Sequence, residues 1–559
     1  MPHHPDLRSL IAALESRGEL HRVKAKVSPI LEITAIADKV SKSKAANTSK
    51  HAADFDPHHH DLGGKALLFE HVEGSPYPVL INAFGSYTRL ELALGCENGG
   101  FDALGDKLGD LIKPEPPVGL MEKIKKGLEL AKIAGLGPKV VSSGACQEVV
   151  MTGDQIDLTQ LPILKCWPLD GDPVAVGYNL TPEQAGTAGG SGRYITLGQI
   201  FTIHPDDAGK PAGEPRPSRN IGMYRAQLLG KKTTAMHWHM HHDGARHWRA
   251  WKKLNEANGT HDRGMPCAIV LGGSSVMPYA ATAPMPPGIS ELLLAGFLQG
   301  EAVKLVPCKT IDMHVPAEAE IVIEGFVSTR AGGIGFDPRT GAPLGVDAVF
   351  EGPFGDHTGF YSLPDRYPVF TATAVTTRKN PVYPTTIVGL PPQEDYYLGK
   401  ATERVFLPLL KTLVPDIRDY DLPMFGTFHN CAFISIKKEY PLQARRVMHA
   451  IWGAGQMAWT KSIVVVDESV NVHDHEAVLF HLCANCDPGR DIEIVNGPLD
   501  ILDHAAPRLG AGHKIGFDAT RKWPGEECGG HAVRDFPEIL KMTAEVEALV
   551  GKRWKEYGL

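Results

Sequence analysis

Residues 220–244 read NIGMYRAQLLGKKTTAMHWHMHHDG. Here, and more widely from Cys146 to Ile311, short runs that favour β-strands alternate with glycine, proline and aspartate. Thr233–Trp238 is one such run, and Tyr194–Ile203 and Ala268–Leu271 are others. Short strands separated by turn residues are typical of a barrel or a sandwich, and not of a doubly wound sheet. The central part of the chain is therefore predicted to be a β domain.

Histidines give the same stretch its chemical character. If residues 233–241 form one strand, its period of two places His237, His239 and His241 on one face. Three imidazoles on such a face are costly to bury unless they meet a ligand, a metal ion or a phosphate group. The pattern predicts a metal-associated or polyanion-binding site. The alternative is that structural hydrogen bonds satisfy these histidines.

A second polar motif lies at residues 351–359, which read EGPFGDHTG. Glu351 and Asp356 flank a Gly-Pro-Phe-Gly turn, so both carboxylates can point into one cavity. In a shared apolar pocket their charges would repel, which raises the pKa of at least one carboxyl and leaves a proton donor near neutral pH. A plain surface turn is the alternative explanation of this run.

The rest of the chain mixes predicted helices and strands. The polar stretch 41–61, which contains the triplet His58–His60, is predicted to be a solvated loop or insertion. We expect an α+β multidomain protein with an N-terminal α/β domain (1–125), a central β domain (126–335) and a C-terminal α/β domain (336–559) that ends in a helix. The predicted helices are at residues 7–14, 31–40, 89–94, 442–452 and 537–557, and the predicted flanking strands are at 66–69, 79–81, 432–436 and 462–466.

Composition excludes several classes of protein. The chain has 559 residues and a net charge of −8, so no global basic field would attract nucleic acid or an anionic membrane. Its nine cysteines lack the dense spacing of a secreted disulfide scaffold. The sequence shows no signal-peptide core and no run of about 18 apolar residues that could cross a membrane. We expect a globular protein of the cytoplasm without a transmembrane segment.

These motifs resemble the UbiD family of reversible decarboxylases, which act on aromatic and α,β-unsaturated acids with prenylated FMN. The resemblance spans nearly the whole chain in the family's order. It implies that the central domain is a split β-barrel that binds the flavin and that the C-terminal domain mediates oligomerisation. The matching segments are Asn220–Arg225, Trp238–His241, Ser290-Glu291, Glu320–Gly325, Glu351–Gly359, Asp518–Thr520 and Lys522–Glu526, with further similarity at residues 67–70 and 78–80.

The resemblance also implies a divalent metal site and a flavin site. Asn220, His241 and Glu291 would hold Mn²⁺ or another divalent ion, with K⁺ nearby, and His242 is the alternative to His241 as a ligand. Amide, carboxylate and imidazole ligands suit such an ion. The implied flavin contacts are Met223, Tyr224, Arg225, His237, Trp238, His239, His242 and Asp243.

The implied catalytic set is Arg225, Glu351 and Asp356. Arg225 would pair with the substrate carboxylate and hold the acidic pair, because a guanidinium stays charged and offers a planar fork. Electron density would pass to the bound cofactor as CO₂ leaves. Asp356, coupled to Glu351, would then protonate the ring carbon.

The implied substrate is an aromatic carboxylic acid. Similarity at Lys522–Glu526 and in the first domain favours a quinone-biosynthesis intermediate of the polyprenyl-hydroxybenzoate or naphthoate type. A small unprenylated hydroxyaromatic or heteroaromatic acid is the alternative. The implied partners are CO₂, a flavin prenyltransferase that supplies the cofactor, copies of the chain in a dimer or hexamer, and a membrane surface if the substrate is lipidic.

Two other functional classes remain open at this point. A metal-dependent hydrolase could use the histidine cluster and a metal-bound water. A non-catalytic homologue could bind a flavin without turning over a substrate. Residues 337–350, which precede Glu351, form an expected longer loop that could reshape the substrate entrance.

Overall fold

The short strand-like runs of the central region form a 10-stranded antiparallel sheet. The computed structural model describes residues 3–112, 135–181, 192–211, 214–285, 289–335, 345–527 and 530–559. The strands of this sheet are β5 (Val149–Thr152), β6 (Tyr194–Ile195), β7 (Gln199–Thr202), β8 (Asn220–Met223), β9 (Ala226–Leu228), β10 (Thr233–Met236), β11 (Met265–Gly272), β14 (Ala319–Val327), β15 (Ala348–Glu351) and β16 (Asp365–Thr377).

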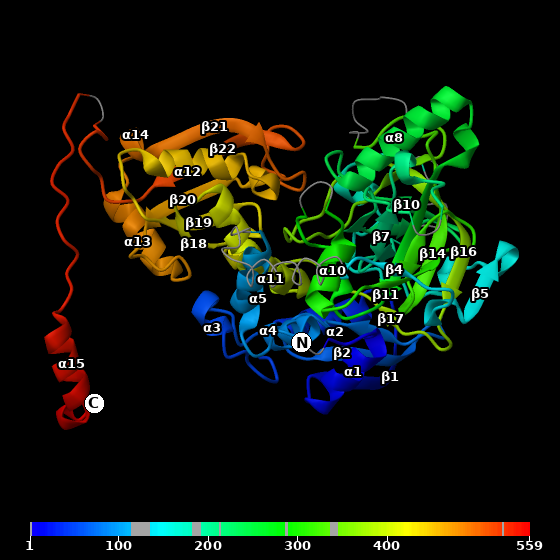
Figure 1. Cartoon of the computed structure of the whole chain (residues 1–559), viewed down its shortest axis with the longest axis horizontal. Coiled ribbons are helices and arrows are strands. Elements are labelled where there is room, and N and C mark those ends of the chain that lie inside the picture. Colours follow the sequence, from blue (N-terminus) through cyan, green and yellow to red (C-terminus); the bar gives the residue numbers. More distant parts are fainter. Residues whose placement is uncertain are drawn as a thin grey trace, which may run out of the picture.

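The central sheet is arranged around the long strand β16. The order is β6-β9-β10-β16-β14-β11-β7-β8, and both β15 and β5 also pair with β16. The register shifts at Leu271/Gly272 and at Glu324/Gly325. Such shifts bend a strand and increase its twist, which curls the sheet into a half-barrel (Figure 1). This confirms the predicted α+β multidomain class with a central curled β-sheet.

The N-terminal region forms a layer beside the central sheet, drawn in blue in Figure 1. Its sheet has the order β1-β2-β3-β17, so a strand from beyond the central sheet completes it and fastens the two regions together. The elements are α1 (Leu7–Ser16), β1 (Leu20–Val27), α2 (Glu32–Ser41), α3 (Ala52–Phe55), β2 (Ala66–Val72), β3 (Val79–Ile81), α4 (Tyr87–Leu94), α5 (Gly100–Ile112) and β17 (Tyr383–Pro384).

Smaller elements surround the central sheet. A three-stranded sheet has the order β13-β12-β4. The elements are β4 (Lys139–Val140), α8 (Asp243–Asn258), α9 (Met277–Ala280), α10 (Glu291–Gln299), β12 (Lys304–Pro307) and β13 (His314–Pro316).

The C-terminal region is a five-stranded sheet of order β18-β19-β20-β22-β21 with helices packed on it. The long helix α11 (Glu394–Leu413) leads into it from the central region (Figure 1). The other elements are β18 (Ile417–Asp421), β19 (Cys431–Ile436), α12 (Gln443–Trp452), β20 (Ser462–Asp467), α13 (His475–Asn485), α14 (Pro488–Asp491), β21 (Ile492–Pro498), β22 (Ala511–Asp518) and α15 (Ala544–Arg553).

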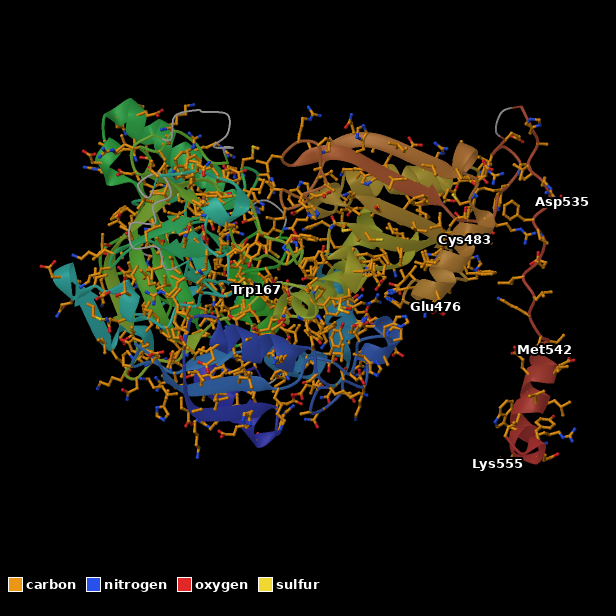
Figure 2. The ribbon with its side chains drawn as sticks, turned by 180° about the vertical axis from the view of Figure 1, so that it is seen from behind. Trp167, Glu476, Cys483, Asp535, Met542 and Lys555 are labelled. Carbon is orange, nitrogen blue, oxygen red and sulfur yellow. The ribbon has the colours of Figure 1, made fainter. Side chains whose placement is uncertain are left out.

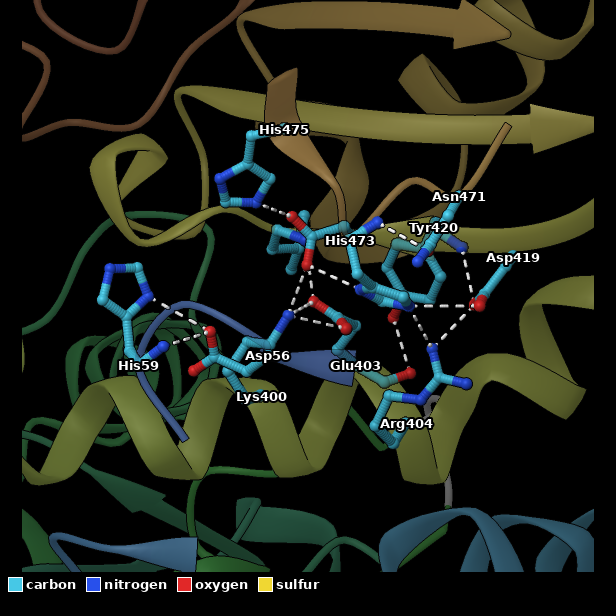
Figure 3. A network of polar contacts seen from close by, with 12 residues as sticks. Asp56, His59, Lys400, Glu403, Arg404, Asp419, Tyr420, Asn471, His473 and His475 are labelled. Atoms are coloured by element: carbon cyan, nitrogen blue, oxygen red, sulfur yellow. Dashed lines mark hydrogen bonds and ion pairs between the residues drawn. The ribbon is translucent and has the colours of Figure 1, made fainter. Parts of the chain in front are cut away.

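A buried polar network joins α11 to the C-terminal sheet (Figure 3). Lys400 Nζ donates to both carboxylate oxygens of Glu403, at 2.9 and 2.8 Å, and to Asp421 Oδ1 at 2.5 Å. His473 lies between Asp419 and Asp421, with each ring nitrogen 3.1 Å from a carboxylate oxygen. Because every buried charge in this network has an opposite partner, the network stabilises the joint between helix and sheet.

Most of the predicted flanking elements are confirmed within a residue or two. Apolar residues at helical or alternating spacing were enough to place them, because each element buries one face. The confirmed elements are α1, α2, β2, β3, α4, β19, α12 and β20.

Three local predictions were wrong. The strand predicted at residues 233–238, and considered as far as 241, ends at Met236, because the chain turns there to begin α8 at Asp243. The stretch 41–61 is not a solvated loop throughout, since α3 buries Ala52 and Phe55. The last helix begins at Ala544 and not at 537, because Thr543 caps it by accepting a hydrogen bond from the Val546 N–H.

The predicted domain boundaries stay predictions. The boundary at 125/126 and most of the expected 337–350 loop lie outside the described residues. Strands β15 and β16, which follow residue 335, pair within the central sheet. The central sheet thus draws on strands from both sides of the predicted 335/336 boundary.

The C-terminal tail leaves the body of the molecule. Helix α15 stands apart at the end of an extended segment, and no residue of this helix is buried (Figure 1). In Figure 2, Asp535, Met542 and Lys555 mark this tail, which runs clear of α13 at Glu476 and Cys483. The start of the tail is fixed by Arg521, which pairs with Glu538 and donates to Phe536 O at 2.8 Å.

Candidate active site

The three residues of the implied catalytic set meet in a buried ion-pair group. Arg225 lies between β8 and β9, Glu351 ends β15, and Asp356 lies in the turn after it. Arg225 Nε and Nη2 donate to the two oxygens of Glu351, at 2.7 and 3.0 Å. Arg225 Nη1 donates to Asp356 Oδ2. The guanidinium carbon also lies 4.6 Å from the ring centre of Phe354. One planar guanidinium therefore orients both carboxylates beside an apolar ring.

The sequence predicted that repulsion between the two carboxyls would raise the pKa of at least one of them. This prediction was wrong. Burial alone would raise the pKa of Glu351, but Arg225 and His237 lower it to about 2. Burial opposes ionisation of Asp356 as well, yet His357 and Arg225 bring its pKa below the usual range. The guanidinium between the acids attracts both carboxylates, and this attraction outweighs their mutual repulsion. Both carboxyls are therefore charged at neutral pH.

Two polar side chains that sequence reasoning missed hold the Glu351–Asp356 turn in place. Asp170 Oδ1 accepts from the Gly355 N–H at 2.8 Å, and its other oxygen accepts from the Trp167 N–H at 2.8 Å. Ser362 Oγ accepts from Arg225 Nη2 at 3.0 Å. Asp170 is more than 180 residues away from the turn, and an isolated aspartate gives no sequence signal of this contact.

Gly355 is required by the packing of Trp167, which is labelled in Figure 2. A Cβ added at Gly355 would lie 2.1 Å from Trp167 Cδ1, closer than any side chain tolerates. The Trp167 indole is itself fixed, because its Nε1–H donates to Val388 O at 2.9 Å. The turn between the two catalytic carboxylates therefore lies directly on a rigid ring.

The histidine cluster lies in the turn between β10 and α8. His237 Nδ1 is 3.0 Å from Glu351 Oε2, so this residue joins the catalytic group. His239 stacks on His242 with ring centres 4.7 Å apart and an angle of 14°. His241 is exposed and packs on Trp459 of the C-terminal region, with ring centres 4.2 Å apart. Burial lowers the pKa of His242 to about 3, so its imidazole is neutral, and its Nδ1 accepts from the His239 N–H at 3.1 Å.

The other implied ligands, Asn220 and Glu291, lie at the start of β8 and at the start of α10. Glu291, at the start of α10, accepts from the Ile221 N–H at 3.0 Å, directly after Asn220. The Tyr224 ring lies 5.0 Å from the His242 ring. The structure thus brings Asn220 and Glu291 together and places His242 on the Tyr224 side, whereas His241 contacts Trp459.

The remaining implied flavin contacts come from the same strands and turn. Met223 belongs to β8, where its N–H donates to Ala281 O at 3.0 Å. Trp238 is fully buried, and a Cβ at Gly244 would lie 2.5 Å from its Nε1. Asp243 begins α8 and pairs with Arg246 at 2.7 Å. These residues therefore come from the end of β8, from the connection to β9 and from the turn between β10 and α8.

Among the residues that the structure describes, two groups of side chains have the spacing of a metal site. The ring nitrogens of His239, His241 and His242 lie within 4.8 Å of one another, and so do the ligand atoms of Glu403, Asp421 and His473. In the second group the Lys400 ammonium already contacts both carboxylates. A protein cation therefore already provides the positive charge in the second group.

Comparison with known proteins identifies the family. Models of the N-terminal, Rift-related and C-terminal domains of 3-octaprenyl-4-hydroxybenzoate carboxy-lyase match residues 11–108, 139–391 and 396–519. An uncharacterized protein of Aquifex aeolicus (strain VF5) is 44% identical over 554 residues, which cover 99% of each chain. The chain belongs to the UbiD family. It is a UbiD-type carboxy-lyase. This reaction class excludes the alternative of a metal-dependent hydrolase.

Solved UbiD-class structures share the fold over almost the whole chain. The enzyme HmfF from Pelotomaculum thermopropionicum, solved in complex with FMN, is 27% identical with a TM-score of 0.66 and covers 97% of this chain and 98% of its own. An evolved dimeric form of HmfF was solved with prFMN. The vanillic acid decarboxylase of Sedimentibacter hydroxybenzoicus, in closed form, has a TM-score of 0.75 at 23% identity and covers 99% and 100%.

The structure gives one further result on location. Across the part of the chain that it describes, no helix is both long enough and apolar enough to pass through a membrane.

Proposed function

We propose that this UbiD-family protein catalyses the reversible, prenylated-FMN-dependent decarboxylation of a small unprenylated aromatic or heteroaromatic acid in the cytoplasm. The observation that carries the proposal is the buried group in which Arg225 binds Glu351 and Asp356 together. Family membership gives the reaction class, and this group supplies a cation and two carboxyls at one point.

The residues present suit the implied metal ion and cofactor. Asn220 and Glu291 offer an amide and a carboxylate oxygen, and His241 or His242 offers an imidazole nitrogen, a donor set that suits Mn²⁺ or Mg²⁺. Met223–Arg225 and His237–His239, with His242 and Asp243, would contact the flavin, and K⁺ would lie nearby. When bound, prenylated FMN supplies an electron sink for the electron pair that CO₂ leaves behind.

Arg225 has one remaining hydrogen-bond donor for a substrate. A guanidinium carries five N–H groups. Four of the contacts from Arg225 go to Glu351, Asp356 and Ser362, and they use Nε–H, both Nη2–H groups and one Nη1–H. The second Nη1–H is left for the carboxylate of an acid, which orients it beside Asp356, the proposed proton donor.

The C-terminal region supports a compact substrate. Its Trp459 packs on His241, and its Phe428 ring centre lies 5.5 Å from that of His357. A site edge covered in this way accommodates a single aromatic ring more readily than a polyprenyl chain. The vanillic acid decarboxylase shares the fold, and its name refers to an acid of this size.

A second candidate substrate is a quinone-biosynthesis acid of the polyprenyl-hydroxybenzoate or naphthoate type. The observation in its favour is the description of the family, which names 3-octaprenyl-4-hydroxybenzoate. Such a substrate would require peripheral contact with a membrane.

Co-production with a flavin prenyltransferase, the proposed cofactor supplier, tests the function. The purified protein should be coloured and should contain near-stoichiometric Mn²⁺ and prenylated FMN. It should release CO₂ from small hydroxyaromatic or heteroaromatic acids, and it should incorporate labelled bicarbonate into the corresponding arenes. Turnover of only the polyprenylated acid selects the second candidate. Colourless protein without turnover of any acid contradicts both.

We also propose that the chain forms a homo-oligomer, a dimer or hexamer, through its C-terminal tail. Helix α15 is only ten residues long, and isolated helices of this length are marginal in water, so it needs a surface to pack on. Its exposed apolar residues cannot reach the body that the tail has left (Figure 2). The outer face of α13, with Leu479 and Phe480 exposed, offers such a surface on a second copy.

A further inference from the structure

The carboxylate of Asp356 has a cation on each oxygen. Its Oδ2 accepts from Arg225 Nη1. Its Oδ1 accepts from the backbone N–H of His357 at 2.8 Å and lies 3.2 Å from the Nδ1 of the same residue. A carboxylate held in this way is stable in its charged form. It can act as a proton donor only if a neighbouring group gives it a proton first.

His357 is the neighbour that can hold such a proton. Its Nδ1 faces Asp356 Oδ1, whereas Arg225 stays charged at all accessible pH values and cannot release one. Glu351, the other acid of the group, is fully buried and receives hydrogen bonds from Arg225 and His237. Of the described groups that contact the Asp356 carboxylate, the imidazole is the one that can release and regain a proton.

His357 also connects the buried group to solvent. It lines a small recess between the central and C-terminal regions, together with Asp395 of α11 and Phe428. Its side chain is 17% exposed. The imidazole can therefore exchange a proton with water.

We propose that His357 is a proton-positioning residue that loads Asp356 for each turnover. The inference rests on the proposed function and deepens it. The Nδ1–H bond of the imidazolium breaks as an O–H bond forms at Asp356 Oδ1, which leaves a neutral imidazole and a carboxylic acid. That acid then protonates the carbon that has lost CO₂, and the electron pair of this carbon forms the new C–H bond. The carboxylate is restored, and the imidazole regains one proton from water for each CO₂ released.

The charges around His357 agree with this role. Burial lowers its pKa, but the hydrogen bond and charge of Asp356, with weaker effects of Asp500 and Asp395, raise it to about 9. The other titratable groups that face it are Arg225, which holds Asp356, and His429, whose ring centre is 6.4 Å away. The imidazole is therefore protonated at neutral pH and loses its proton in the alkaline range.

The His357→Asn variant tests the proposal. The Asn amide keeps a donor at the Nδ1 position but cannot lose a proton. We expect kcat for decarboxylation to fall about 100-fold, the usual effect of losing a proton-transfer group. The alkaline limb of the kcat profile near pH 9 should disappear, whereas prenylated-FMN content and KM stay near wild-type values. The control is His504→Asn, which replaces a histidine that packs on Phe360. This variant should retain the wild-type kcat profile.

A second measurement does not depend on turnover. NMR titration of histidine-labelled, flavin-free protein should show the imidazoles of His357 and His473 with pKa values near 9, and the His357 resonance should vanish in His357→Asn. In Asp356→Asn the same resonance should titrate below 7, because the raising charge is gone. A His357 resonance that titrates below 7 in the wild type, or a His357→Asn enzyme with the wild-type kcat profile, overturns the proposal. Loaded wild-type protein that decarboxylates no acid contradicts the proposed function instead.

Discussion

The Lys400 ammonium and the Asp421 carboxylate lie 2.5 Å apart, and both side chains are only 2% exposed. Lys400 belongs to α11, which begins at Glu394, and Asp421 ends the first strand of the C-terminal sheet. Glu403 and His473 complete the contact (Figure 3). The pair therefore fixes the C-terminal region, whose Trp459 and Phe428 lie at the edge of the site, to the helix that leads into it.

Replacing Lys400 by Met should strongly destabilise this joint. The variant leaves Glu403 and Asp421 buried without their cation, and breaking a buried pair in this way costs about 3–5 kcal/mol. Denaturant unfolding followed by tryptophan fluorescence measures the loss. Lys437→Met, in a lysine 48% exposed, is the control and should change the free energy of unfolding by less than about 1 kcal/mol. Equal stability of the two variants would contradict the role of the network.

Alkaline pH should weaken the same joint. Burial lowers the pKa of His473, but Asp419 and Asp421 raise it to about 9. A group whose folded pKa lies above its unfolded value of about 6.5 stabilises fully below pH 6.5, and this stabilisation is lost as pH rises through 9. The side chain is 3% exposed, so the contribution is of the order of 3 kcal/mol.

Unfolding curves at several pH values between 6 and 10 measure this dependence. His473→Gln should lose the part of this pH dependence that His473 causes. Its free energy of unfolding should therefore fall less than that of the wild type between pH 6 and pH 10. Retention of the full wild-type pH dependence in His473→Gln would show that other groups cause it.

Gly355→Ala should disrupt the active site through Trp167. The new Cβ would lie 2.1 Å from the indole, which is held by its hydrogen bond to Val388 O. The turn that carries Asp356 must then move, and we expect kcat to fall at least about 100-fold because misplacement by about 1 Å has this effect. Steady-state kinetics of the loaded enzyme measure it. Combining Gly355→Ala with Trp167→Leu should restore part of the activity, and a fully active Gly355→Ala enzyme would contradict the packing argument.

Arg225→Lys should lose most activity although it keeps the charge. A lysine cannot bridge Glu351 and Asp356 with a planar fork and still bind a substrate carboxylate. We expect kcat/KM to fall about 100- to 1,000-fold, with an increase in KM, because the substrate contact and the carboxylate orientation are both lost. Initial rates across substrate concentrations provide both constants. Unchanged KM would argue against a carboxylate contact from Arg225.

Charged residues on the apolar face of the tail should dissociate the oligomer into single chains. Leu540 is 98% exposed and Leu549 is 50% exposed, yet both are apolar. A buried glutamate at either position would lack a partner, so Leu540→Glu with Leu549→Glu should reduce the mass measured by light scattering to that of one chain. Lys541→Glu, on the same tail, should retain the oligomer. A wild-type chain that is monomeric would contradict the proposed role of the tail.

Much of the secondary structure could be predicted from local periodicity. Elements such as α1 and β20 bury one apolar face, and this burial leaves a clear pattern in the sequence. The histidine-rich stretch could not be predicted in the same way. The alternation of His237, His239 and His241 has the period of a strand, but the chain must turn after Met236 to begin α8. Local propensity does not show where the chain leaves a sheet to begin the next helix.

The sequence by itself determined the family, the mixed α+β class and the identity of Arg225, Glu351 and Asp356 as a candidate set, because these depend on residue types and their order. Only the tertiary structure decided the charge state of the two acids. The guanidinium of Arg225 lies between them and attracts both, whereas sequence spacing alone predicts that they repel. It also decided that Asp170 contacts the Asp356 turn, because a contact across so large a sequence separation depends on how the sheet curls.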